Sequence, residues 1–343
     1  MSFEYEIIKL FTYFGSVMVV SKFLPQILLK KYKLKNYNLV SDISKIELPP
    51  ELFQLNYSLD EQKIRKKKYS KELLEISNKI LNILPDTKFF LRSINDVKIK
   101  KLKDRNTDKN SIVIKKGAYS VKRNIICVEN PIYLSHEIFH LASSYFDFMN
   151  DILYSGFSQI NNITKTTIGK GLNEGYTALL DEKYFKSKPG SYVLEKHFAN
   201  ILEMIVGKEK MLKFYCTADL KGLIVELSKY DKPENIIKFI NDFEFLEASK
   251  VLTLDKNFIN EKLQFIAKFL TECYLNKMIS DIPFDIPMKY ITFSMINFFE
   301  KIGTGFAIKD KEFSYFESDY LENLLDRIFK DKQYRSKKII FFK

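Results

Sequence analysis

The sequence has few cysteines, and their number and spacing indicate the redox environment of the protein. Only three occur in 343 residues, Cys127, Cys216 and Cys273, and they are far apart in apolar surroundings. An odd number of scattered cysteines is typical of reduced, buried thiols in a reducing compartment. None of them has the spacing of a zinc motif.

The N-terminus lacks the features of an export signal. Glu4 and Glu6 occupy the place of a basic leader region, and no small-residue cleavage site follows. The apolar run at residues 10–20 is shorter than a membrane span, so it predicts a core or interfacial helix. We therefore expect a cytoplasmic protein whose N-terminal segment belongs to the fold. Association of this segment with a membrane surface is the alternative, supported by the lysines that follow it, Lys30, Lys31, Lys33 and Lys35.

The chain also lacks internal repeats, a glycine-rich phosphate loop and a second metal motif. Its net charge is +12, but the basic residues are mostly lysines, interleaved with acids along the whole length. A dispersed charge of this kind favours a solvated surface over a specific nucleic-acid partner. With 46% hydrophobic and 15% aromatic residues, the composition is that of a globular protein with one large domain or two smaller ones.

Histidine is scarce too, yet two of the three histidines stand four residues apart in the stretch 133–143. On an α-helix, positions i and i+4 share one face, so His136 and His140 can direct their imidazoles at one ion, with Glu137 beside it. A chance match to this pattern is expected in roughly two of a thousand such chains. The alternative is a pair of core histidines on an amphipathic helix, and a second motif downstream weakens it.

That second motif is Asn173-Glu174-Gly175, which offers a third ligand. The sequence His136-Glu137-x-x-His140 followed by this Asn-Glu pair resembles the gluzincin class of zinc metallopeptidases, over about residues 130–210. The resemblance implies a Zn²⁺ ion held by His136, His140 and Glu174. It also implies that Glu137 is the catalytic base.

Gluzincins commonly place a tyrosine or histidine near the metal, where it stabilises the oxyanion. The resemblance therefore implies such a residue here; Tyr192 is the preferred candidate, and His197 and Tyr154 are alternatives. Tyr192 and His197 lie about 140° apart on a helical wheel, so we expect only one of them to face the site. Thr177 and Asp181, in the same predicted helix as the third ligand, either support a ligand or are ordinary surface residues.

Hydrophobic periodicity and turn signals predict an α+β fold. Helices are expected to about residue 31 and over residues 60–84, 134 to about 146–150, 173–185, 191–206, 233–249, 257–279, 288–301 and 315–329. Short strands are expected over residues 88–92, 97–102, 111–114 and 124–128, a loop or hairpin over 152–170, and a disordered tail or edge strand over 330–343. We predict three segments: an N-terminal helical segment (1–84), a zincin-like catalytic lobe with a small mixed sheet and the His-Glu-x-x-His helix (85–217), and a mainly helical C-terminal lobe (218–343).

These features predict a zinc metallopeptidase that hydrolyses a peptide or protein substrate through a zinc-activated water, with Glu137 as general base. An edge strand beside the metal would hold an extended substrate by main-chain hydrogen bonds. The competing interpretation is a zincin-shaped, catalytically silent zinc-binding protein that docks a protein partner or a membrane surface. Glu137 argues against it, because a purely structural zinc site has no use for a carboxylate directly after the first ligand.

Overall fold

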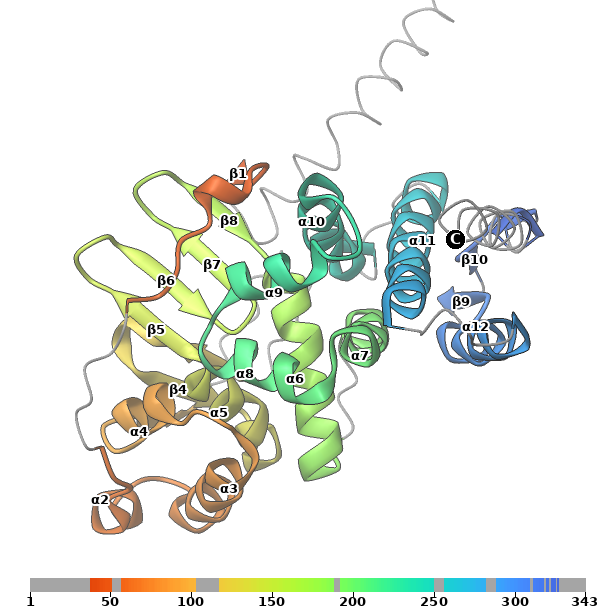
Figure 1. The fold of residues 1–343 in the computed structure, drawn as a ribbon. Helices are drawn as coiled ribbons and strands as arrows, with labels where there is room; N and C mark the ends of the chain where they lie inside the picture. The colour runs from red at the N-terminus through yellow and green to blue at the C-terminus, as the bar shows by residue number, and fades with distance from the viewer. Residues whose placement is uncertain are drawn as a thin grey trace, which may run out of the picture.

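The computed structural model describes the chain over these ranges: residues 38–50, 57–102, 117–187, 192–249, 256–281, 288–308 and 311–326, the last without 318, 321 and 325. Helices and three small sheets form a mixed α+β architecture, as the sequence predicts (Figure 1). The expected N-terminal helix, the strand at residues 111–114 and the tail at 330–343 lie outside the described residues. None of the described helices is both long enough and apolar enough to cross a membrane.

The largest sheet has five strands in the order β1-β8-β7-β6-β5. Its strands are β1 (Asn38–Leu39), β5 (Ser144–Asp147), β6 (Ile152–Ser155), β7 (Ser158–Asn161) and β8 (Thr166–Ile168). β1 pairs with β8 in parallel, and the other neighbouring pairs are antiparallel. The region 152–170, expected as a loop or hairpin, thus forms three strands, because alternate residues such as Ile152 and Tyr154 are buried.

The second sheet has the order β2-β4-β3 and precedes the helix that carries the two histidines. Its strands are β2 (Lys98–Lys101), β3 (Gly117–Ser120) and β4 (Ile125–Val128). β2 and β4 confirm two predicted strands, and β3 was not predicted. The strand predicted at residues 88–92 is wrong. That stretch belongs to helix α4 (Lys88–Ile94), in which the adjacent Phe89 and Phe90 are both buried, as the alternating faces of a strand would not allow.

Helix α5 (Leu134–Ala142) carries both histidines and ends earlier than predicted. The hydroxyl of Ser144 donates to the carbonyl oxygen of His140 at 2.5 Å, which satisfies a carbonyl at the helix end. Ser144 is also the first residue of β5, so the chain extends where the prediction continued the helix to 146–150. The helix predicted over 60–84 is likewise divided into two, α2 (Glu61–Arg65) and α3 (Ser70–Ile83).

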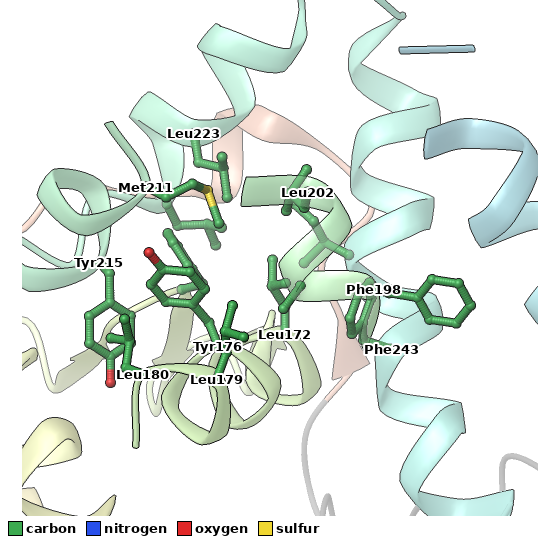
Figure 2. Packing of buried hydrophobic residues seen from close by; sticks show 14 of the residues in the cluster. Leu172, Tyr176, Leu179, Leu180, Phe198, Leu202, Met211, Tyr215, Leu223 and Phe243 are labelled. Carbon is green, nitrogen blue, oxygen red and sulfur yellow. The ribbon is translucent and has the colours of Figure 1, made fainter. Parts of the chain in front are cut away.

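The helices that follow the sheets share one core. α6 (Lys170–Phe185) and α7 (Val193–Val206) confirm two predicted helices and pack against each other. The next helices are α8 (Lys208–Cys216), α9 (Leu220–Leu227) and α10 (Pro233–Ser249). Figure 2 shows the side chains that these five helices bury together, among them Leu172, Tyr176, Leu179, Leu180, Phe198, Leu202, Met211, Tyr215, Leu223 and Phe243. One buried cluster runs from Val40 to Tyr315 and includes residues of all three predicted segments, whose boundaries stay predictions.

The C-terminal part is mainly helical, with α11 (Lys256–Asp281) and α12 (Met288–Ile302) close to their predicted ranges. A hairpin of β9 (Gly305–Ile308) and β10 (Lys311–Ser314) follows and was not predicted. Several described residues between 320 and 326 are helical, within the helix predicted at 315–329. The three cysteines are unpaired thiols; Cys216 and Cys273 are buried and Cys127 is partly exposed.

Candidate metal centre

Helices α5 and α6 bring three ligand-type side chains to one point. His136 and His140 project from α5, and Glu174 projects from the second turn of α6. His140 Nε2 lies 3.2 Å from His136 Nε2 and 3.2 Å from Glu174 Oε2. The third separation, from His136 Nε2 to Glu174 Oε2, is 3.5 Å. The three residues predicted as ligands therefore meet in one cluster, although they come from two helices.

These separations suit a tetrahedral ion. Zinc bonds of about 2.0–2.1 Å at tetrahedral angles separate neighbouring donor atoms by about 3.3 Å. The observed separations of 3.2, 3.2 and 3.5 Å are close to that value. Two imidazoles and one carboxylate form a donor set of catalytic zinc sites, which keep a fourth position for water. Within the described ranges, this is the one group of three metal-ligand side chains whose donor atoms lie close together.

Asn173 lies against the far side of the His140 ring. Its Nδ2 is 3.3 Å from His140 Nδ1, and its Oδ1 accepts a hydrogen bond from the N–H of Phe157 at 3.3 Å. The amide of Asn173 therefore links the Nδ1 edge of the His140 ring to the main chain of Phe157. This contact places Asn173 where it can orient His140 towards the candidate metal position.

A buried hydroxyl network fixes Asn173 in turn. Thr177 Oγ1 donates to the carbonyl oxygen of Asn173 at 2.8 Å and lies 2.7 Å from the hydroxyl of Tyr215, in α8. Gly156 allows this approach: it has φ 53°, and a Cβ there would lie 2.1 Å from Asn173 Oδ1. Thr177 and Asp181 are both buried, so of the two alternatives for them, that of ordinary surface residues is wrong.

Glu137 lies beside the three ligands and is not one of them. Its side chain is buried, and its carboxylate packs against the first residue of β3. A Cβ at Gly117 would come within 2.5 Å of Glu137 Oε1, so this close approach requires glycine. Strand β3 therefore limits the position of the Glu137 carboxylate.

Tyr192 reaches the same site from the N-terminus of α7. Its ring is parallel to that of His136, with centroids 6.2 Å apart. Burial, followed by the negative charge of Glu174, raises the pKa of Tyr192 well above its ordinary value. Burial would also raise the pKa of Glu174, but the imidazoles of His140 and His136 outweigh it and hold that pKa well below its ordinary value.

The two alternatives to Tyr192 point elsewhere. His197 Nε2 donates to the carbonyl oxygen of Ile302 at 2.9 Å, and its ring stacks on Tyr315. The hydroxyl of Tyr154 donates to the carbonyl oxygen of Leu48 at 3.2 Å, on the face of the five-stranded sheet that residues 40–50 cover. As predicted, Tyr192 and His197 do not face the same site.

Several residues of the site were not identified from the sequence. Asn173 stood in the second motif without an assigned role, and its place directly before Glu174 was the available signal. Gly117 and Tyr215 carry no local signal, because they lie far from both motifs in the chain. Only the tertiary fold brings them to the site.

The metal centre is supported by its own geometry and by the two sequence motifs. Comparisons with protein-family models, with curated protein sequences and with solved structures found no match to this chain. The relationship to gluzincins therefore stays a prediction from those motifs.

Proposed function

We propose that this protein is a zinc-dependent metallopeptidase of the gluzincin type with a zincin-like catalytic lobe. The observation that carries the proposal is a set of three ligand-type side chains at tetrahedral spacing, with a buried Glu137 next to the set. When bound, zinc supplies Lewis-acid polarisation of a water molecule and of the substrate carbonyl. His136, His140 and Glu174 would hold the ion and leave its fourth position open.

Glu137 is the general base of the proposed reaction. It takes the proton of the attacking water and passes it to the leaving amine, so one carboxylate serves as base and then as acid. Its placement supports this role, since Gly117 and α5 confine the carboxylate beside the ligands while leaving it outside the donor set. A positioned general base contributes about 10²–10⁴-fold to the rate.

Tyr192 is the proposed donor to the oxyanion. Its ring lies parallel to that of the candidate ligand His136, with centroids 6.2 Å apart, and this position supports a role for its hydroxyl as donor to the carbonyl oxygen of a substrate.

The substrate class follows from β3. In the described part of the chain, this strand pairs only with β4, so its other edge can pair with an extended peptide. Gly117 ties the same strand to Glu137, which would place the main chain of a bound peptide next to the base. We therefore propose peptides or proteins in an extended conformation as substrates.

Glu137→Gln tests the function. The substitution removes the base and keeps the three ligands, so hydrolysis of a mixed peptide library should fall by orders of magnitude while the zinc content stays unchanged. Glu182→Gln, at an exposed position of α6, is the matched control and should keep full activity. A zinc-loaded wild type that cleaves no peptide would contradict the proposal and favour the catalytically silent scaffold.

A further inference from the structure

Helix α6, which carries Asn173 and the candidate ligand Glu174, begins without a capping side chain of its own. Gly169 stands directly before its first residue and has no side chain, and the first turn contains no acidic residue. The first N–H groups of a helix have no partner within the helix, and a Ser, Thr, Asn or Asp at this place usually accepts one of them. The start of α6 therefore depends on another segment of the chain for an acceptor.

That acceptor is Glu244 of α10. Its Oε1 accepts the main-chain N–H of Gly171 at 2.7 Å, and Glu244 is buried, with 4% of its surface exposed. A carboxylate is a strong acceptor, and its negative charge is favourable at a helix N-terminus. Gly171 lies three residues before Glu174, which is about 4.5 Å along the helix axis. The hydrogen bond from α10 is thus made within one turn of the candidate ligand.

The backbones of α6 and α10 also meet at this point. A Cβ at Gly171 would lie 2.5 Å from the carbonyl oxygen of Phe243, the residue before Glu244. A Cβ at Gly169 would collide with the carbonyl oxygen of Phe157, in the turn between β6 and β7. Both close approaches require glycine, since any other side chain would push the segments apart. The first turn of α6 is therefore held by two segments, α10 and the β6–β7 turn.

The geometry of the metal centre depends on where this turn is held. His136 and His140 come from α5, whereas Glu174 comes from α6. A shift of α6 along its axis would therefore change the separation of 3.2 Å between Glu174 Oε2 and His140 Nε2. Without Glu244, the buried N–H of Gly171 would lose its acceptor, and the first turn of α6 would be free to fray.

We infer that Glu244 is a positioning residue for the candidate ligand Glu174. This role rests on the proposed function, because it presupposes an ion held by His136, His140 and Glu174. It also extends the site beyond the predicted catalytic lobe (85–217), because Glu244 lies in the predicted C-terminal lobe (218–343). A change in α10 should therefore alter metal affinity without touching a ligand.

Zinc affinity of full-length variants tests this role. Glu244→Ala removes the acceptor and should weaken zinc binding about tenfold, at the lower end of the loss that is usual for residues supporting a metal ligand. Glu244→Gln keeps an oxygen that accepts the Gly171 N–H, so it should bind zinc as the wild type does. Glu244→Asp draws the carboxylate back by one methylene and should lie between the two. Competition with a chromophoric chelator measures each Kd.

Asp242→Ala is the matched control on the same helix. Asp242 is 3% exposed and forms ion pairs with Lys238 at 2.8 Å and with Lys262 at 3.2 Å. Its removal leaves two lysines without this partner and should lower the melting temperature. It makes no bond to the start of α6 among those described, so the Kd for zinc should stay at the wild-type value.

Co²⁺ in place of zinc supplies a readout that loss of stability alone would not change. Its visible absorption depends on the ligands and their geometry. The spectrum of Glu244→Ala should differ from that of the wild type, because Glu174 is displaced. The spectra of Glu244→Gln and Asp242→Ala should match the wild type.

Two results would overturn the role of Glu244 and leave the proposed function in place. One is a zinc Kd and a Co²⁺ spectrum of Glu244→Ala that equal those of the wild type. The other is an equal loss of affinity in Glu244→Ala and Asp242→Ala, which would assign the effect to general destabilisation. If Glu244→Ala does not fold, Glu244→Asp decides, and wild-type affinity in that variant would overturn the role. A wild type that binds neither zinc nor Co²⁺ would overturn the metal centre as well.

Discussion

Gly117→Ala tests the position of Glu137 without changing an ionisable residue. The new Cβ would lie 2.5 Å from Glu137 Oε1 and 3.1 Å from its Cδ and Cγ. Ordinary contact begins at 3.4 Å, so Oε1 must withdraw by about 0.9 Å. A misplacement of about 1 Å costs on the order of 100-fold in rate, or about 2.7 kcal/mol in activation free energy. We therefore expect kcat/KM for peptide hydrolysis to fall about 100-fold.

Two further readouts separate this effect from damage to the fold. Zinc content and the melting temperature should stay near the wild-type values, because the Cβ meets only the flexible end of Glu137 and the backbone of Gly117 is not left-handed. Ser120→Ala, at an exposed position of the same strand, should leave kcat/KM unchanged. In a Glu137→Gln background, Gly117→Ala should lower kcat/KM only slightly further, since both substitutions act on one group. Full activity of Gly117→Ala would refute the assignment of Glu137 as the base.

Three other predictions concern the neighbours of the ligands and the metal itself. Asn173→Ala should weaken zinc binding about 10–100-fold, because His140 loses the group that orients its ring; competition with a chromophoric chelator measures it, and an unchanged Kd would remove Asn173 from that role. Tyr192→Phe should keep zinc and lower kcat by about 10²–10³-fold, the usual cost of one oxyanion donor; an unchanged kcat would leave the oxyanion donor unassigned. Removal of zinc with a chelator should lower the melting temperature, and added zinc should restore it, because the proposed ion would link α5 to α6; a melting temperature that is insensitive to the chelator would count against a metal in this cluster.

Two of the candidate ligands were predictable because they follow from a local pattern. The spacing of His136 and His140 reflects the period of a helix and needs no tertiary information. Glu174 required more: it was placed through the resemblance of its motif to gluzincins, and the structure brings it to 3.2 Å from His140. The same resemblance made Tyr192 the preferred oxyanion-stabilising residue. The stacking of its ring on His136 places it at the site.

The surroundings of the ligands were not predictable because they depend on distant segments. Two strands, β3 and β4, and the first turn of α5 separate Gly117 from Glu137, and the role of Gly117 is set by the packing of β3 against α5. Tyr215, from α8, contacts Thr177 of α6 and through it the main chain of Asn173. The strand predicted at residues 88–92 followed from the strand preference of aromatic residues. It is wrong because burial of Phe89 and Phe90 on one helix outweighs that preference.

The measurement closest to the central claim is zinc affinity in Glu174→Ala compared with Glu137→Gln. Both substitutions remove a carboxylate from the same site, but Glu174 Oε2 lies within 3.5 Å of both imidazole nitrogens, whereas Glu137 is not part of the three-residue group. We predict about one zinc ion per chain in the wild type and in Glu137→Gln, and a large loss of affinity in Glu174→Ala. Equal zinc affinity in Glu174→Ala and the wild type would contradict the two-histidine, one-glutamate centre on which the proposed function depends.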